Sequence, residues 1–331
     1  MKDAKKYLKS FLIFFLVTVL IGSAAGVLLQ KKVEDIIDNP IFNPPDVKLV
    51  DQLDWIVPVD SPLFETFTES ERVNILCLGV NQGMTDVIIV ASYDIKNQKI
   101  DLISVPRDTY YYREGKTGSA FFKINSIYHT SGKNAKGENK DPVAIAKAVS
   151  DVLQGMPINY YAVISFDSVR TIINAMGGVD YDIPQDMDYD DPYDTPPLSI
   201  HFKAGPYHFD GDDALKYLRF RADYIDGDIG RIHAQQEFIK AAFKQMLKSN
   251  LLKMARVISD NVETDITWGF VKSVVETITN FSADSLSTYT MPNTPQIGEP
   301  WFVYPNPEEI VAMIKEIYLR SETAAAGQTA N

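Results

Sequence analysis

The sequence predicts an α/β protein, a three-layer α/β/α sandwich with a central mixed sheet, preceded by one N-terminal transmembrane helix. Three short apolar runs, at residues 73–78, 86–94 and 99–105, are typical of buried strands. Residues 141–176 then alternate between helical spacing and a strand pattern, which is typical of helices packed on a covered sheet. The N-terminal helix is predicted by residues 11–29, an apolar run without a charge that is about long enough to cross a bilayer core.

The N-terminal segment indicates the compartment. Four lysines and one aspartate precede the apolar run, so residues 1–9 are expected to stay in the cytoplasm and the rest to be exported. Small residues after Gly22 leave a cleaved signal peptide as the alternative, but the apolar run resumes at Val27 and favours an anchor at residues 10–29. We therefore expect a single-pass cell-membrane protein with an extracellular C-terminal domain.

Composition limits the possible partners. The 331 residues carry a net charge of −12, which argues against nucleic acid as the main partner because phosphate backbones select basic proteins. A local basic cluster inside an acidic shell can still bind a small anion. The single cysteine, Cys77, lies in an apolar run, so a buried thiol is expected rather than a disulfide.

The body of the chain is expected at residues 71–320. Residues 30–70 contain five prolines and are expected to form an extracellular linker that packs partly on this domain. Residues 321–331 are small and polar, which predicts a disordered tail. The chain has no internal repeat.

The strands and helices follow in order. Residues 95–98 are a hairpin-length turn between the second and third strands, and Pro106 ends the third strand. Residues 115–137 are polar and contain glycine, so we expect a mobile loop over the site. Asp141 caps a helix that starts at Pro142.

The second half of the chain continues this pattern. The remaining expected elements are a strand at 160–166, a helix at 167–176 closed by two glycines, a solvated acidic loop at 180–194, helices at 235–248 and 268–279, a strand at 287–291 and a helix at 308–319. The acidic loop resembles a calcium loop only in part, because Asp191 stands where the turn glycine belongs.

Arginines near the middle of the chain are candidates to bind phosphate. Arg219 and Arg221 are one residue apart at the end of an apolar run, so an extended backbone would point both to one face. Arg231 and Gln235 are four residues apart in the predicted next helix and share a face near its N-terminus. Converging guanidiniums bind phosphate oxygens well, whereas ion pairs with nearby aspartates are the simpler alternative.

Three further candidates lie at strand ends, where α/β proteins usually bind ligands. Arg107 could clamp a phosphate, while Asp86 and Asp108 could hold a divalent ion or act as a base. The alternatives are a strand-end cap for Asp86 and an ion pair with Arg107 for Asp108. The sequence has no Gly-x-Ser-x-Gly or His-Glu-x-x-His motif, so the remaining chemistry favours phosphoryl transfer without a covalent enzyme intermediate.

Several short motifs occur between residues 73 and 236. The motif Phe-x-Gly-x-x-Ala-Leu-x-Tyr-x-Arg-x-Arg ends at Arg221. The other segments are Thr85-Asp86, Pro106-Arg107-Asp108-Thr109, Lys123-Ile124-Asn125, Gly177-Gly178-Val179, and Asp228-x-Gly230-Arg231 followed by Gln235-Gln236. Together these motifs resemble those of the LytR-CpsA-Psr family of cell-wall proteins, and the resemblance covers residues 73–236.

The resemblance implies a function. Family members carry glycopolymers from a polyprenyl-pyrophosphate lipid to peptidoglycan outside the membrane, and they use an α/β/α fold with an apolar tunnel for the lipid. It implies that Arg107, Asp86 and Asp108 are catalytic, and that Asp86 and Asn81 hold Mg²⁺. The implied pyrophosphate-binding residues are Arg107, Arg219, Arg221, Arg231 and Gln235.

The chain departs from the family pattern at three positions. Asn81 and Met84 stand where the family has aspartate and arginine, and Ala234 stands where it has arginine. These changes remove one metal carboxylate and two guanidiniums. They leave open a polyprenyl-pyrophosphate-binding protein without turnover, or a lipid pyrophosphatase, as alternatives to a transferase.

Overall fold

The computed structural model describes residues 57–81, 84–133, 137–193, 197–220, 251–266, 285–296 and 298–328, together with residues 237, 238, 241, 242, 245, 249 and 270. The described residues divide into two compact units, and residues 71–320, predicted as one domain, contribute to both. The sheet unit contains residues 57–163, 264–266 and 285–328, and the hairpin unit contains residues 164–263 and 270.

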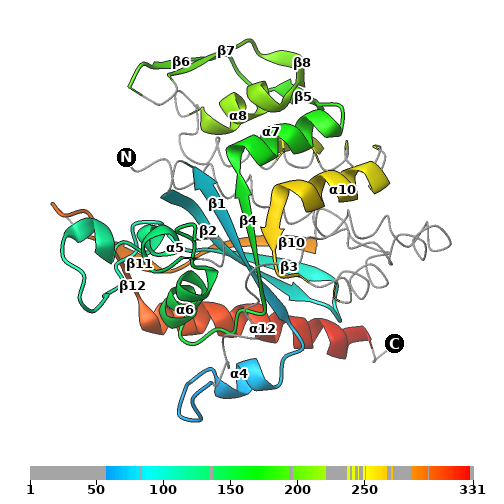
Figure 1. The fold of residues 1–331 in the computed structure, drawn as a ribbon. Helices are drawn as coiled ribbons and strands as arrows, with labels where there is room; N and C mark the ends of the chain where they lie inside the picture. Colours follow the sequence, from blue (N-terminus) through cyan, green and yellow to red (C-terminus); the bar gives the residue numbers. More distant parts are fainter. Residues whose placement is uncertain are drawn as a thin grey trace. The chain divides into compact units, whose positions relative to one another are not determined.

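A mixed six-stranded sheet, most of which belongs to the sheet unit, has the strand order β10-β3-β2-β1-β4-β9 (Figure 1). Its strands are β1 (Val73–Asn81), β2 (Met84–Asp94), β3 (Lys99–Ser104), β4 (Tyr160–Ser165), β9 (Val262–Thr264) and β10 (Leu286–Thr290). Strands β1, β2 and β3 form an antiparallel meander, whereas β10 runs parallel to β3. The predicted mixed sheet and the 95–98 turn are therefore confirmed, while the three-layer arrangement stays a prediction.

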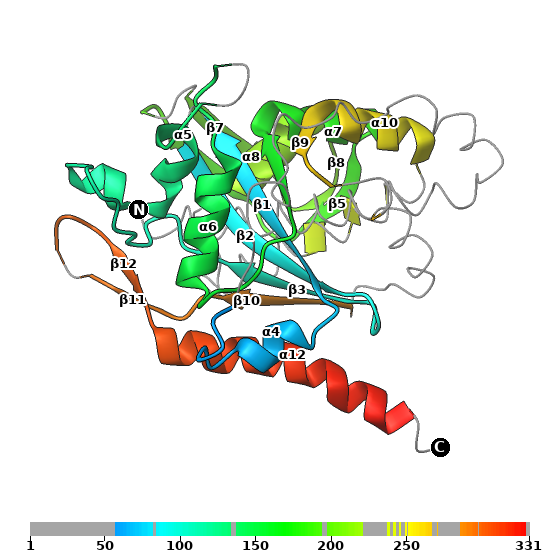
Figure 2. The same cartoon turned by 60° about the horizontal axis from the view of Figure 1, so that its bottom comes forward.

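One face of the sheet packs against helices. Leu76, Leu78, Ile88 and Val90 alternate toward a core that also contains residues of α6 (Pro142–Val152) and α12 (Pro307–Gln328). The short helix α4 (Phe64–Thr68) lies alongside α12 (Figure 2) and adds Phe67 to this core.

The opposite face of the sheet carries side chains that are also buried. Ile75, Cys77 and Ile89 alternate with the core residues and are at most 1% exposed. Burial raises the pKa of the Cys77 thiol, as expected for an inert thiol. The strands are therefore apolar on both faces, which explains why they read as nearly continuous hydrophobic runs.

Local sequence signals set the helix boundaries. The Asp141 carboxylate accepts a hydrogen bond from the Ala144 amide at 2.8 Å, and Pro142 occupies the first turn, so the predicted start of α6 is confirmed. Helix α7 (Phe166–Ala175) begins after Ser165, whose hydroxyl accepts from the Ser168 amide.

The hairpin unit combines helices with two β-hairpins. Strand β5 (Val179–Ile183) pairs with β8 (Gly205–Phe209), and β6 (Met187–Asp191) pairs with β7 (Leu198–Phe202). Helices α7, α8 (Gly211–Arg219) and α10 (Leu251–Asn261) complete the described part of the unit. Its core is aromatic: the ring centroids of Phe209 lie 5.1 Å from those of both Tyr217 and Phe238.

Two motif glycines are required by close packing in this unit. Gly178 has a φ of +81°, and a Cβ there would overlap the ring of His208. A Cβ at Gly211 would overlap the backbone of Arg170, where α8 meets α7. Only glycine allows these backbones to approach so closely.

Four local expectations were wrong. Residues 180–194 contain strands β5 and β6, because Val179, Ile183 and Met187 face inward while the aspartates between them face solvent with period two. Residues 115–137 contain helical segments η2 (Ser119–Phe122), η3 (Ile124–Ser126) and α5 (Ile127–Thr130), held by the buried Ile124, Ile127 and Tyr128. Arg219 ends helix α8 rather than an extended run. Helix α12 continues through residues 321–328, which were expected to be disordered.

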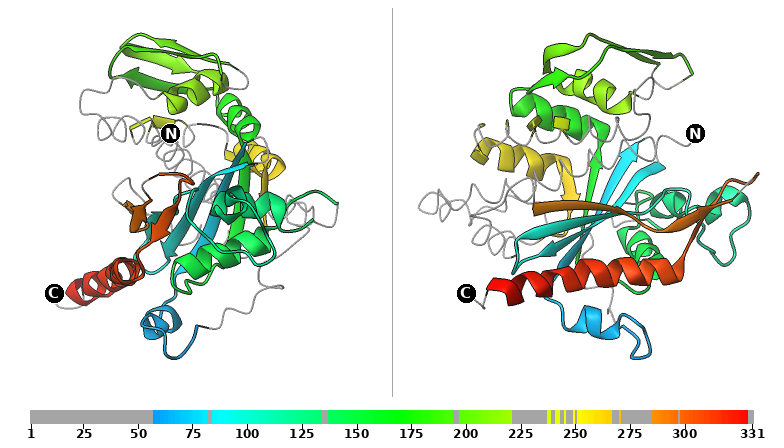
Figure 3. Two further views of the ribbon diagram at one scale, coloured as in Figure 1. Left: turned by 90° about the vertical axis from the view of Figure 1, so that its left-hand side faces the viewer. Right: turned by 180° about the vertical axis from the view of Figure 1, so that it is seen from behind.

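The C-terminal part of the sheet unit also contains the hairpin of β11 (Asn293–Pro295) and β12 (Val303–Pro305), coloured orange in Figure 3. The predicted helices at 235–248 and 268–279 lie largely outside the described residues, and the predicted anchor at residues 10–29 lies wholly outside them. Among the described residues, no helix is both long and apolar enough to cross a membrane.

Candidate functional site

The candidate site begins where β3 ends. The Val105 amide donates to the Ile88 carbonyl at 2.9 Å and continues the ladder with β2. Pro106 has no amide hydrogen, so the ladder stops there. The Thr109 amide and hydroxyl both donate to the Pro106 carbonyl, at 3.0 and 2.6 Å, and close a tight turn. This turn presents Arg107 and Asp108 at the end of the sheet where strand β3 stops.

A second segment is held against this turn. The Ile124 amide donates to the Thr109 carbonyl at 2.9 Å, and the Asn125 amide donates to the Arg107 carbonyl at 3.2 Å. Thr109 is 0% exposed and Asn125 is 3% exposed, so the contact is buried. The two motifs are therefore one structural element, and this contact brings Lys123 to Asp108.

The resulting cluster consists of Arg107, Asp108 and Lys123. The Lys123 ammonium lies 3.0 Å from one Asp108 carboxylate oxygen, and the Arg107 Nε lies 3.9 Å from the other. The Asp108 side chain is 7% exposed, whereas the two cationic side chains are 21% and 23% exposed. A buried carboxylate thus positions two partly exposed cations, an arrangement that suits binding of an anion.

The β1–β2 hairpin places two more predicted site residues at this end of the sheet. Gly79 pairs with Val87 and Val80 pairs with Thr85, so Asp86 is the extra residue of a β-bulge. Asn81 pairs with Met84 at the hairpin end. Bulges redirect a side chain and often lie next to active sites. The backbone therefore supports a site here, while the side chains of Asn81, Met84 and Asp86 lie outside the described part of the structure.

Two buried oxygens near this edge have no hydrogen-bond partner among the described residues. They are the hydroxyl of Thr85, directly before Asp86, and the side-chain carbonyl of Asn125. Buried polar atoms in this state usually face a ligand, an ion or water. A hard cation such as Mg²⁺ takes oxygen ligands, so these atoms fit the expected cofactor. No group of three or more His, Cys, Asp or Glu gathers within the described residues.

The remaining predicted residues are placed only in part. Arg219 is the last residue of α8, in the hairpin unit, and its side chain is partly buried. Arg221, Arg231, Gln235 and the variant position Ala234 lie outside the described residues. Convergence of the arginines on one anion therefore stays a prediction.

Sequence reasoning missed Lys123 and Asn125 as site residues. Their motif was visible, but its polar surroundings indicated a loop. The separation of Asp108 and Lys123 along the chain does not reveal that their side chains are in contact. The contact depends on the backbone hydrogen bonds between the two segments.

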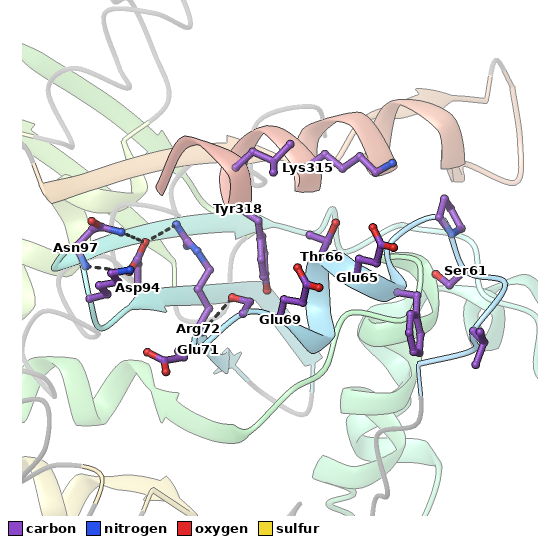
Figure 4. A pocket seen from close by; sticks show the side chains of 16 residues that line it. Ser61, Glu65, Thr66, Glu69, Glu71, Arg72, Asp94, Asn97, Lys315 and Tyr318 are labelled. Atoms are coloured by element: carbon purple, nitrogen blue, oxygen red, sulfur yellow. Dashed lines mark hydrogen bonds and ion pairs between the residues drawn. The ribbon is translucent and has the colours of Figure 1, made fainter. Parts of the chain in front are cut away.

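A buried arginine lies at the opposite end of the strands. Arg72 precedes β1, and its guanidinium lies 2.9 Å from the Asp101 carboxylate. The guanidinium also lies 3.4 Å from Asp94 and 5.1 Å from the ring centre of Tyr318 (Figure 4). It borders a cavity of about 940 Å³ between α4, the β2–β3 turn and α12. Burial raises the pKa of the Tyr318 hydroxyl, consistent with a dry core behind the cavity. This arginine joins α12 to the sheet.

Comparison with known proteins agrees with the fold and the motifs. The model of the LytR_cpsA_psr family matches residues 51–318. Bacillus subtilis TagV is 33% identical over 231 residues, which cover 66% of this chain and 56% of TagV. Bacillus cereus TagU is 31% identical over 209 residues, which cover 60% of this chain and 62% of TagU. The chain therefore matches less than two thirds of the length of these relatives, both of which are named polyisoprenyl-teichoic acid–peptidoglycan teichoic acid transferases.

Solved structures show the same architecture. The crystal structure of B. subtilis TagV aligns with a TM-score of 0.54 and 27% identity, covering 75% of this chain and 97% of the chain in that crystal structure. That of B. subtilis TagU aligns with a TM-score of 0.51 and 22% identity, covering 75% of this chain and 96% of the chain in that crystal structure, and supports the fold alone. The family model covers most of the chain, and two of the motifs, at residues 106–109 and 123–125, meet at the end of β3. The chain belongs to the LytR_cpsA_psr family.

Proposed function

We propose that this protein is a membrane-anchored extracellular phosphotransferase that moves a glycopolymer from a polyprenyl-pyrophosphate lipid to a hydroxyl of peptidoglycan. The observation that carries the proposal is the cluster of Arg107, Asp108 and Lys123, built from two family motifs in a chain whose relatives are named as transferases. Two cations fixed by one buried carboxylate provide a preorganised positive charge for a pyrophosphate.

The reaction is a displacement at phosphorus. The acceptor hydroxyl oxygen attacks the phosphorus joined to the glycan and forms a new P–O bond. The bond between that phosphorus and the bridging oxygen breaks, and polyprenyl phosphate leaves with the electron pair. Arg107 and Lys123 stabilise the charge that builds up on the phosphate oxygens, and the hydroxyl proton passes to a carboxylate at the site.

The two carboxylates have different parts in this proposal. Both Asp108 oxygens face a cation, so Asp108 positions Arg107 and Lys123 rather than accepting the proton. We assign proton transfer to Asp86, whose backbone is the extra residue of the bulge. Asp86 and Asn81 would hold Mg²⁺, which when bound neutralises pyrophosphate charge. Asn81 offers a neutral oxygen where the family has a carboxylate.

The rest of the machinery follows from the family pattern. Arg219, Arg221, Arg231 and Gln235 would complete the pyrophosphate site, and an apolar tunnel would take the lipid tail. The anchor at residues 10–29 would hold the domain at the outer face of the membrane, where such a lipid is available.

A second candidate is a protein that binds the lipid pyrophosphate without turning it over. Met84 and Ala234 remove two charge-assisted contacts of the family pattern, each worth about 1.5–3 kcal/mol. This candidate predicts bound lipid and no product.

The proposal is tested by turnover of the full-length protein in detergent with a lipid-linked glycopolymer, peptidoglycan and Mg²⁺. Arg107→Ala is expected to lower kcat/KM by about 100-fold, because one preorganised contact to developing charge is lost. Arg170→Ala is the matched control, since Asp167 and Asp212 already bind that guanidinium. An Arg107→Ala variant as active as wild type would remove the site assignment.

A further inference from the structure

A continuous row of aromatic rings lies beside the cluster. The rings of Tyr112 and Phe122 stack in parallel, with centroids 5.9 Å apart and planes inclined by 9°. Phe122 is 6.0 Å from Tyr110, and Tyr110 is 5.3 Å from Tyr304. The row of Tyr112, Phe122, Tyr110 and Tyr304 is called the aromatic row below.

The backbone fixes this row to the candidate site. Tyr110 is two residues after Asp108, and its amide donates to the Val303 carbonyl at 2.9 Å. The Val303 amide in turn donates to the Asp108 carbonyl at 3.0 Å, and the Tyr111 amide donates to the Phe122 carbonyl at 2.8 Å. The row is therefore held by the same strand-end turn that presents the cationic cluster.

The aromatic row packs on a buried ring, and two of its own rings are exposed to solvent. Phe302 is 5% exposed and meets the Tyr110 ring edge-on at 5.2 Å. Tyr112 is 66% exposed and Tyr304 is 41% exposed. Large rings kept in contact with water at fixed positions are unfavourable for stability alone, and such patches mark binding surfaces.

We infer that the aromatic row binds successive sugar rings of a glycan and guides the acceptor hydroxyl to the Arg107–Asp108–Lys123 cluster. One face of a pyranose ring presents C–H groups that pack on the electron-rich face of an aromatic ring. The edge of the sugar carries hydroxyls that need hydrogen-bond partners. This inference rests on the proposed function, because it assigns the acceptor of that reaction.

Polar groups flank the row, as a sugar requires. The Tyr304 hydroxyl donates to the Gln296 side chain at 3.2 Å, so a polar pair stands at one end. At the other end Arg113 follows Tyr112, and its guanidinium donates to the Thr130 hydroxyl at 2.7 Å. Alternating ring faces and hydrogen-bonding groups suit an amphipathic carbohydrate.

A lipid surface fits the row less well. The most exposed rings of the row, Tyr112 and Tyr304, are tyrosines, and the exposed large aliphatic residues among the described ones, Val59 and Leu319, are not part of the row. Val59 and Leu319 instead line the cavity beside Arg72. Rings preset at fixed angles by backbone hydrogen bonds provide a shaped surface, whereas a membrane patch needs only apolar area.

The test measures direct binding of a soluble chitooligosaccharide to the full-length protein in detergent, without any lipid donor. Binding is measured by calorimetry or saturation-transfer NMR. Tyr112→Ala is expected to weaken binding by about fivefold and the double variant with Tyr304→Ala by more, while Tyr112→Phe retains the ring and the affinity. Tyr193→Ala is the control, because Tyr193 is 95% exposed in the hairpin unit and outside the row.

The outcomes separate the two proposals. Ring-dependent sugar binding supports the aromatic row whether or not the protein transfers a glycopolymer. Equal sugar affinity of wild type and the double variant, or no sugar binding by wild type, overturns it even if Arg107-dependent transfer is found. Loss of binding to phosphatidylglycerol vesicles in the double variant, with sugar affinity unchanged, overturns it in favour of a membrane contact.

Discussion

Removing the Lys123 ammonium tests how the cluster is held together. Lys123→Met keeps most of the aliphatic stem but leaves the Asp108 carboxylate, whose side chain is 7% exposed, without its partner at 3.0 Å. Breaking a fully buried ion pair costs about 3–5 kcal/mol. Lys123 is 21% exposed and Arg107 remains 3.9 Å from Asp108, so we expect a smaller loss of about 2 kcal/mol in the free energy of unfolding.

The assay is chemical denaturation combined with a double-mutant cycle. Asp108→Asn in the Lys123→Met background should recover part of the lost stability, because the side chain no longer carries the charge that Lys123 balanced. Lys147→Met is the control: its pair with Asp151 is exposed and should contribute less than about 1 kcal/mol. Equal effects of Lys123→Met and Lys147→Met, or strictly additive effects of Lys123→Met and Asp108→Asn, would refute the coupling inferred from the structure.

Three further changes have defined outcomes. Arg72→Met leaves Asp94 and Asp101 buried without their guanidinium and should lower the free energy of unfolding by about 3–5 kcal/mol in urea; a loss below about 1 kcal/mol would contradict its role in joining α12 to the sheet. Burial lowers the pKa of His129 below its ordinary 6.5, so the folded state resists protonation and stability should fall as the pH drops below 6.5; His129→Gln should remove that part of the pH dependence, and an unchanged profile would count against it. Chelation of Mg²⁺ should abolish transfer and added Mg²⁺ restore it, and Asp86→Ala should resist that rescue; full turnover in chelator would exclude the metal.

The strands of the sheet could be predicted because their signals are local. Continuous apolar runs identify β1 and β3, Pro106 limits the end of β3, and Asp141 with Pro142 fixes the start of α6. Each of these signals acts within a few residues of the element that it determines.

The incorrect predictions came from sequence patterns that are compatible with more than one local structure. The aspartates around residue 186 suggested a solvated loop, but their period of two is also that of a strand with one solvent-exposed face. Arg219 was expected in an extended run, but Asp210 caps a helix by accepting from the Asp213 amide, and the helix includes Arg219.

The candidate site was only partly accessible to sequence reasoning. Arg107 and Asp108 could be identified from their place after a strand. Lys123 could not, because its contact with Asp108 depends on two backbone bonds that join distant segments. The bulge at Asp86 also depends on pairing register, which composition does not determine.

Product analysis by mass spectrometry tests the central claim most directly. Full-length protein is incubated with a polyprenyl-pyrophosphate-linked glycopolymer, Mg²⁺ and peptidoglycan, and the muropeptides are then examined. We expect glycopolymer joined to peptidoglycan through a phosphodiester, with release of polyprenyl phosphate. Intact lipid bound to the protein without product, or free phosphorylated glycan without a peptidoglycan adduct, would contradict the transferase.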